Sequence, residues 1–97
     1  MRTVGQQDMT MPLSNETALV TGASRGIGAA TARAFAAAGA RVALISRSGD
    51  AIAELAGEIG PAALAIPCDV SRYWEVAAAV DACRETFGGP DILIGNA

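Results

Sequence analysis

The sequence predicts an α/β fold with a parallel sheet, and three observations lead to that prediction. Four short apolar runs, typical of strands buried on both faces, alternate along the chain with three longer runs that carry apolar residues at helical spacing. A glycine-rich turn joins the first strand-like run to the first helical run. A strand, a helix and a second strand in this order form a right-handed crossover, so the two strands should be parallel neighbours. With 97 residues, the chain has room for one small domain.

The expected strands are short and rich in apolar residues. They span Thr17 to Thr21, Arg41 to Ser46, Ala63 to Pro67 and Asp91 to Ile94. Residues 1–15 show no hydrophobic periodicity, and they lack the basic start and apolar centre of a signal peptide. We therefore expect a flexible tail over residues 1–15, a partial domain over residues 16–97 that is truncated after the fourth strand, and a cytoplasmic location by default.

Three helices are expected between these strands. The first follows the glycine-rich turn and ends before Gly39, a typical residue just past a helix C-terminus. The second runs from Asp50, its expected N-cap, to Ile59. The third spans Arg72 to Phe87, with Ser71 as its expected N-cap. The faces expected to be buried consist of Ile27, Ala30, Thr31, Ala34, Phe35 and Ala38 in the first helix, Ile52, Leu55, Ala56 and Ile59 in the second, and Tyr73, Val76, Ala77, Val80, Cys83 and Phe87 in the third.

The composition argues against several classes of protein. The formal net charge is −3 and the chain has neither lysine nor histidine, which argues against a surface for nucleic acids or anionic membranes. No run of apolar residues is long enough to span a bilayer. The two cysteines, Cys68 and Cys83, are too few for a disulfide scaffold or a four-ligand zinc site. We expect them to be reduced thiols in or near the core, and we expect no metal site.

The glycine-rich turn has the features of a phosphate-binding turn. Thr21 to Gly28 reads Thr-Gly-Ala-Ser-Arg-Gly-Ile-Gly. Gly22 lets the chain leave the strand sharply, Gly26 lets backbone N–H groups approach a pyrophosphate, and Gly28 lets the helix pack close to the strand. The N-terminus of the helix, with its unpaired N–H groups and positive dipole end, then favours an anion. An ordinary glycine loop is the alternative, but the strand before the turn and the helix after it favour phosphate binding.

This turn resembles the signature turn of the short-chain dehydrogenase/reductase family. The family's Gly-x-x-x-Gly-x-Gly spacing is matched by Gly22, Gly26 and Gly28, whereas the wider Rossmann group uses Gly-x-Gly-x-x-Gly. The resemblance extends from about Thr17 to Ala97. It implies a Rossmann-like parallel sheet with strand order 3-2-1-4, with the first two helices on one face and the third on the other. It also implies hydride transfer between NADP(H) or NAD(H) and a carbonyl or alcohol substrate.

Two arginines favour NADP over NAD. In a dinucleotide-binding fold the residue after the second strand contacts the adenine ribose, and an acidic residue there would accept a hydrogen bond from the 2′-hydroxyl of NAD. This chain has Ser46 and Arg47 at that place, and Arg25 lies within the glycine turn. Both arginines could flank a 2′-phosphate, and in the resembled family basic residues at these two places go with NADP. The alternative is that both are solvated surface arginines.

The ends of the third and fourth strands carry two further parts of the resemblance. Asp69 and Val70 resemble the family's Asp-Val pair beside the adenine ring, where Asp69 would accept from the exocyclic amine. Alternatively, Asp69 caps the turn into the next helix. Gly95-Asn96-Ala97 matches part of the family's Asn-Asn-Ala-Gly, with Gly95 in place of the first Asn. The resemblance thus implies a cofactor-binding set of Gly22, Ser24, Arg25, Gly26, Ile27, Gly28, Ser46, Arg47, Asp69, Val70, Asn96 and Ala97.

The resembled family places its catalytic serine, tyrosine and lysine beyond the fourth strand. This chain has no lysine, and its one tyrosine, Tyr73, has Ala77 four positions later. We therefore expect no catalytic residue here, and we expect the chain alone to be the inactive NADP-binding portion of an oxidoreductase. The alternative is a non-catalytic nucleotide-binding or interaction module derived from the same fold. Full-length relatives are expected to be homo-oligomers, and this chain is expected to self-associate through the exposed edge of its fourth strand.

Overall fold

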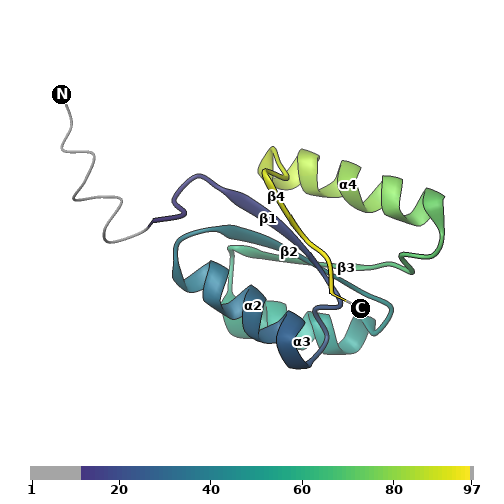
Figure 1. The fold of residues 1–97 in the computed structure, drawn as a ribbon, viewed down its shortest axis with the longest axis horizontal. Helices are drawn as coiled ribbons and strands as arrows, with labels where there is room; N and C mark the ends of the chain where they lie inside the picture. The colour runs from purple at the N-terminus through teal and green to yellow at the C-terminus, as the bar shows by residue number, and fades with distance from the viewer. Residues whose placement is uncertain (1–11, 97) are drawn as a thin grey trace.

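A four-stranded parallel sheet organises the residues described by the computed structural model, which are residues 12–96 (Figure 1). The strands are β1 (Thr17–Thr21), β2 (Arg41–Ser46), β3 (Ala63–Pro67) and β4 (Ile92–Ile94). The helices are α2 (Gly26–Ala37), α3 (Gly49–Ile59) and α4 (Tyr73–Phe87). All paired strands are parallel and their order is β3-β2-β1-β4, which confirms the predicted order 3-2-1-4.

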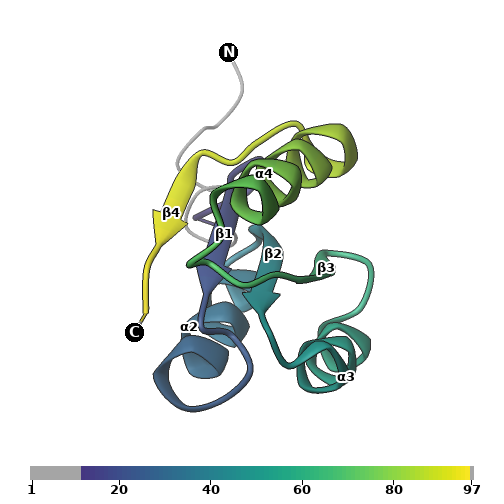
Figure 2. The ribbon, with the colours of Figure 1, turned by 90° about the vertical axis from the view of Figure 1, so that its right-hand side faces the viewer.

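The helices cover both faces of the sheet, as predicted. Figures 1 and 2 show α2 and α3 on one face and α4 on the other. Alternate residues of β1 point to opposite faces, because successive side chains of a strand alternate: Ala18 and Val20 pack with α2 and α3, while Leu19 packs with α4. The central strands are therefore buried on both sides, which is the physical reason for their continuous apolar sequence.

The phase of α2 differs from the prediction. Gly28, Ala29 and Ala32 are its buried residues, whereas Ile27 is 78% exposed. Ala30 and Ala34, also expected inside, are exposed, and of the expected face only Phe35 packs against the core. In a helix this rich in alanine, nearly every face is apolar, so periodicity carries little information about which side is buried.

Helices α3 and α4 begin differently from the predictions. Helix α3 begins at Gly49 with Ser48 as N-cap, so Asp50 lies in its first turn, although its predicted inner face of Ile52, Leu55, Ala56 and Ile59 is confirmed. Helix α4 has Arg72 rather than Ser71 as N-cap. The Ser71 hydroxyl instead donates to Asp69 Oδ1 at 2.7 Å, and this hydrogen bond turns it away from the helix N-terminus.

The inner face of α4 is made of smaller residues than predicted. Ala79 and Cys83 are buried, with Val76 and Val80 packed beside them. Tyr73 is 82% exposed and Ala77 is also exposed, so these two assignments were wrong. The expected core cysteines are confirmed: Cys68 and Cys83 are both buried free thiols, and burial is the main reason that the pKa of each thiol is raised.

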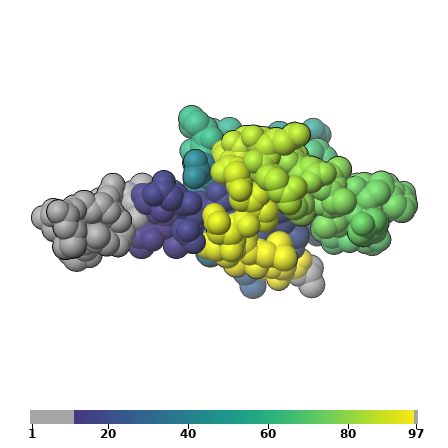
Figure 3. Space-filling view, turned by 90° about the horizontal axis from the view of Figure 1, so that it is seen from above, coloured from purple at the N-terminus to yellow at the C-terminus, as the bar shows by residue number. Residues whose placement is uncertain are grey.

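Both ends of β4 are hydrogen-bonded to β1. At the start, the Thr17 N–H donates to Asp91 Oδ2 at 2.9 Å and the Asp91 N–H donates to the Thr17 carbonyl at 2.8 Å. Asp91 thereby binds β1 from the position just before β4. Strand β4 itself begins at Ile92, one residue later than predicted. At the far end, the Asn96 N–H donates to Thr21 Oγ1 and its side-chain amide donates to the Thr21 carbonyl. Figure 3 shows this segment, in yellow, at the surface beside α4.

Residues 12–15, which the sequence analysis assigned to the tail, form a turn that contacts the domain. The Leu13 N–H donates to the Ala38 carbonyl at 2.9 Å, and the Glu16 N–H donates back to the Leu13 carbonyl. The rest of the expected tail lies outside the described residues. Over residues 12–96, no helix has the length and apolar character needed to cross a membrane.

Candidate functional site

The turn between β1 and α2 has a backbone geometry that requires glycine at three positions. Gly22 has φ +63°, and a Cβ there would lie 3.0 Å from the Asn96 carbonyl oxygen. A Cβ on Gly28 would lie only 1.9 Å from the Gly22 carbonyl oxygen, so the first turn of α2 packs directly on the chain leaving β1. Gly26 has φ +61° with open space where a Cβ would stand, so its backbone conformation is what favours glycine there.

The N-terminus of α2 has no capping side chain. Its N-cap is Arg25, which has an extended backbone (φ −166°, ψ 174°) and whose side chain makes no capping hydrogen bond. The first turn of the helix holds no acidic residue. The first N–H groups of a helix have no partner within the helix, and together they form the positive end of its dipole. This helix end is therefore suited to an anion such as a pyrophosphate.

The two predicted arginines line one pocket, although they lie far apart in the sequence. This arginine pocket has a volume of about 320 Å³ and is lined by Ser24, Arg25, Ser46, Arg47, Ser48 and Ala51. Its walls come from the glycine turn, the end of β2 and the start of α3. No carboxylate is among the lining residues. Two guanidinium groups and three serines make a donor set suited to a phosphate group.

A second pocket adjoins the first. This Asp69 pocket has a volume of about 210 Å³ and is lined by Gly22, Ile45, Ser46, Arg47, Cys68, Asp69, Val70 and Asn96. It shares Ser46 and Arg47 with the arginine pocket. The two pockets therefore lie next to each other, and together they are called the crevice, which lies beyond the carboxyl ends of β1, β2 and β3, beside the place where strand order reverses. Ligands of open α/β sheets bind at that place.

Asp69 is held as an ionised acceptor. Its Oδ1 accepts the Ser71 hydroxyl at 2.7 Å and the Ser71 N–H at 3.0 Å. The Ser71 hydroxyl hydrogen bond is the main cause that lowers the pKa of the Asp69 carboxyl, and the positive charges of Arg47 and Arg72 lower it further. Asp69 therefore shapes the turn toward α4, the alternative role considered from the sequence, and it also lines the Asp69 pocket.

The family model described as short chain dehydrogenase matches residues 16–97 of this chain. This chain belongs to the short-chain dehydrogenase family. The match confirms the resemblance that the glycine spacing had indicated. It covers every strand and helix of the structure.

Relatives within the family are similar over most of this chain. A galactitol 2-dehydrogenase of Agrobacterium fabrum is 47% identical over 87 residues, which is 90% of this chain and 34% of the relative. A D-threitol dehydrogenase of Mycolicibacterium smegmatis is 41% identical over 93% of this chain and 36% of its own length. The chain therefore spans about a third of the length of these relatives.

Two solved structures share the fold. The 3-ketoacyl-(acyl-carrier-protein) reductase of Brucella melitensis, in complex with NADH, has a TM-score of 0.82 and 44% identity over 84% of this chain and 34% of its own. A hydroxysteroid dehydrogenase from Escherichia coli has a TM-score of 0.80 and 37% identity over 84% of this chain and 35% of its own. These similarities support the Rossmann-like fold class.

The crevice brings together most of the residues that the sequence analysis selected. Those that line it are Gly22, Ser24, Arg25, Ser46, Arg47, Asp69, Val70 and Asn96. Gly26, Ile27 and Gly28 form the start of α2 and line neither pocket, and Ala97 lies outside the described residues. Four residues that line the crevice were not in the predicted set: Ile45, Ser48, Ala51 and Cys68. The position of Ser48 directly after Arg47, at a strand's carboxyl end, was a usable signal.

Other features of the site concern metals and Asn96. Across residues 12–96 there is no group of three or more His, Cys, Asp or Glu side chains that could hold a metal ion. Asn96 lines the Asp69 pocket, but its amide N–H groups also donate to Thr21. Its position therefore depends on the hydrogen bonds that join β4 to β1.

Proposed function

We propose that this chain is the NADP-binding portion of a short-chain dehydrogenase/reductase that transfers hydride between NADP(H) and a carbonyl or alcohol. The observation that carries the proposal is the arginine pocket, where Arg25 and Arg47 face one space that no carboxylate lines. When bound, NADP(H) would supply or accept the hydride. The residues of this chain would bind and orient it.

Each part of the cofactor has residues that suit it. The uncapped N-terminus of α2 would take the pyrophosphate, since its free N–H groups favour an anion. The arginine pocket would take the 2′-phosphate through charge-assisted hydrogen bonds from Arg25 and Arg47. The Asp69 pocket would take the adenine, with the ionised Asp69 carboxylate as acceptor for its exocyclic amine.

The preference for NADP rests on the arginines. The related Brucella reductase is in complex with NADH, so the fold alone does not imply a preference for NADP. In this chain Ser46 and Arg47 stand where NAD-binding proteins place an acidic residue for the ribose 2′-hydroxyl. The cationic side chains of Arg25 and Arg47 would therefore favour the 2′-phosphorylated ribose of NADP over the ribose of NAD.

We assign the catalytic step to no residue of this chain. Tyr73 is exposed at the start of α4, and Ala77 stands where a lysine partner would be needed. The chain also has no lysine at any position. We therefore propose that these 97 residues bind the cofactor and do not by themselves turn over a substrate.

Titration of the chain with NADPH and with NADH tests the cofactor assignment. NADPH should bind more tightly, and Arg47→Gln should weaken NADPH binding by about tenfold to a hundredfold while leaving NADH nearly unchanged, because a charge-assisted hydrogen bond contributes about 1.5 to 3 kcal/mol. Arg84→Gln is the matched control, since it removes the same charge from an exposed arginine of α4 that pairs with Asp81. Equal affinities for the two dinucleotides, or equal effects of the two substitutions, would refute the assignment.

A further inference from the structure

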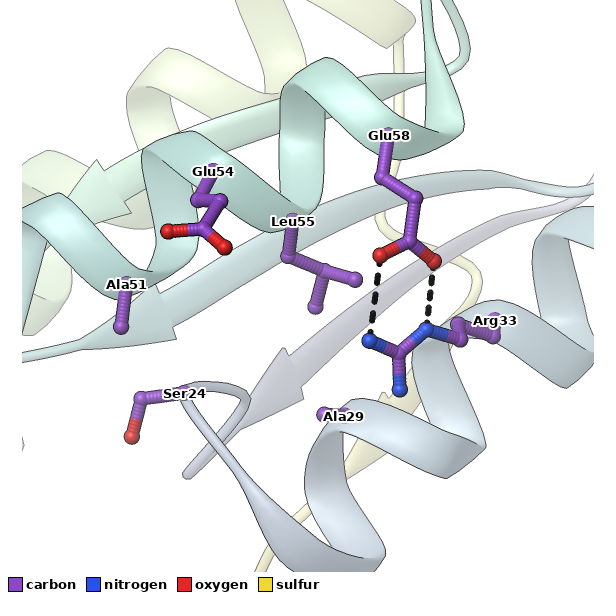
Figure 4. A pocket seen from close by; sticks show the side chains of 7 residues that line it. All are labelled: Ser24, Ala29, Arg33, Ala51, Glu54, Leu55 and Glu58. Carbon is purple, nitrogen blue, oxygen red and sulfur yellow. Dashed lines mark hydrogen bonds and ion pairs between the residues drawn. The ribbon is translucent and has the colours of Figure 1, made fainter.

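Helices α2 and α3 lie side by side on one face of the sheet (Figure 2). Side chains of both helices, together with Ser24, line a pocket between them (Figure 4). This interhelix pocket has a volume of about 140 Å³. Ala29 of α2 presents only a methyl group to it, opposite Leu55 and Glu54 of α3. Ala29 and Leu55 belong to one buried cluster that holds both helices on the sheet, and the pocket lies on the solvent side of that cluster.

A single ion pair crosses this gap. Arg33 Nε donates to Glu58 Oε2 at 2.6 Å and Arg33 Nη2 donates to Glu58 Oε1 at 3.2 Å, so the contact is bidentate (Figure 4). Over residues 12–96 it is the one ion pair that joins two helices, because the others lie within α4 or at its start. The hydrogen bond from Arg33 is the main cause that lowers the pKa of the Glu58 carboxyl. Both partners are thus charged at neutral pH.

The interhelix pocket and the arginine pocket share two walls. Ser24 and Ala51 line both of them. Ser24 precedes Arg25 at the start of α2, and Ala51 follows Ser48 in the first turn of α3. Since each helix moves largely as a rigid rod, a change in the separation of α2 and α3 at the ion pair also changes the separation of these walls.

We propose that Arg33 and Glu58 are positioning residues that, on the solvent side of the shared core cluster, hold the outer parts of α2 and α3 at the separation at which the arginine pocket fits a 2′-phosphate. This inference rests on the proposed function. It assigns part of the NADP preference to a pair that lines the interhelix pocket and not the arginine pocket. Neither residue contacts the cofactor in this proposal, and their effect is transmitted through the two helices.

Glu58→Gln is the decisive variant because two explanations predict opposite signs. By long-range electrostatics alone, removal of a negative charge near the arginine pocket strengthens NADPH binding. Loss of the ion pair instead lets the helices separate, so we expect the ratio of NADPH to NADH affinity to fall about threefold, a size set by the small energies of exposed ion pairs. Glu54→Gln is the matched control, since Glu54 lines the same pocket on the same helix. It should leave the ratio unchanged or raise it.

The charge-exchanged double variant, Arg33→Glu with Glu58→Arg, supplies the rescue. It restores an ion pair of reversed polarity, so it should return the affinity ratio to that of the unmodified chain. It also keeps the inference testable if Glu58→Gln fails to fold. If the Glu58→Gln chain melts at a lower temperature but keeps its preference for NADPH, the ion pair contributes to stability alone. That result would overturn the inference. Equal affinity of the unmodified chain for NADPH and NADH would instead refute the proposed function, and this inference with it.

Discussion

At the scale of single residues, Gly28 is the position where a side chain is least compatible with the structure. Its missing Cβ would stand 1.9 Å from the Gly22 carbonyl oxygen and 2.7 Å from the Gly22 carbonyl carbon. Neither atom can move without displacing the turn that ends β1. The close approach also sets which face of α2 meets the sheet, because Gly28 must lie over Gly22. Ile27 is then directed outward, where it is 78% exposed.

Gly28→Ala should destabilise the chain by about 1 to 3 kcal/mol or more, the usual range for overpacking at a rigid site. Urea unfolding followed by circular dichroism measures this. Gly57→Ala is the control, because Gly57 lies in α3 with no atom within 4 Å of its missing Cβ. That substitution should stabilise the chain by about 0.5 to 1 kcal/mol through helix propensity. A Gly28→Ala chain as stable as the unmodified one would contradict the packing described here.

At the scale of elements, the position of β4 depends on a few side chains of β1 and of the flanking loops. Thr21 Oγ1 accepts from the Asn96 N–H at 3.1 Å and donates to the Ile94 carbonyl at 3.3 Å. At the other end, Asp91 Oδ2 accepts from the Thr17 N–H. These contacts supplement the short ladder of three residue pairs between β1 and β4. Asn96, and with it one wall of the Asp69 pocket, follows the position of β4.

Thr21→Val keeps the shape of the side chain and removes both hydrogen bonds of the hydroxyl. We expect a loss of about 1 to 2 kcal/mol in unfolding free energy, since a partly buried hydrogen bond contributes about 1 kcal/mol. Hydrogen exchange should accelerate at the Asn96 amide, while amides shared by β2 and β3 keep their protection. Thr86→Val, an exposed threonine of α4, is the control and should change neither quantity. Unchanged exchange at Asn96 would contradict this role of Thr21.

At the scale of the whole molecule, the sheet ends in two edge strands, β3 and β4, each paired on one side among the described residues. Among the described residues β4 pairs with β1 alone, so its other edge has no strand beside it. Leu93, at the middle of β4, is 70% exposed. An apolar strand with an unpaired edge favours pairing with another chain.

We therefore expect the 97-residue chain to self-associate in a concentration-dependent way. Size-exclusion chromatography with light scattering should show broad species larger than a monomer. Leu93→Lys should shift the population toward monomer, because a charged side chain on an edge strand opposes pairing. Ile27→Lys is the control, since it adds the same charge to an equally exposed apolar residue away from the edge. A sharp monomer peak for the unmodified chain at all concentrations would refute this expectation.

The sequence by itself determined the succession of strands and helices along the chain, the family and the residues of the glycine turn. The reason is that these depend on local patterns: apolar runs covered on both faces, glycines at a characteristic spacing, and a clear amphipathic pattern such as that of Ile52, Leu55, Ala56 and Ile59 in α3. The two arginines could also be selected from their places after the turn and after β2. Most of the predicted crevice residues lie together because they follow parallel strands whose carboxyl ends meet at one edge of the sheet.

Tertiary structure alone decided the features that depend on contacts between distant segments. The phase of α2 follows from the packing of Gly28 on Gly22, since its alanine-rich sequence is apolar on almost every side. The start of α4 follows from the Asp69 carboxylate, which takes the Ser71 hydroxyl that would otherwise cap the helix. The ion pair of Arg33 and Glu58 joins residues that have no common sequence pattern. Such contacts form only when the sheet has brought the two helices side by side, so no local pattern could have predicted them.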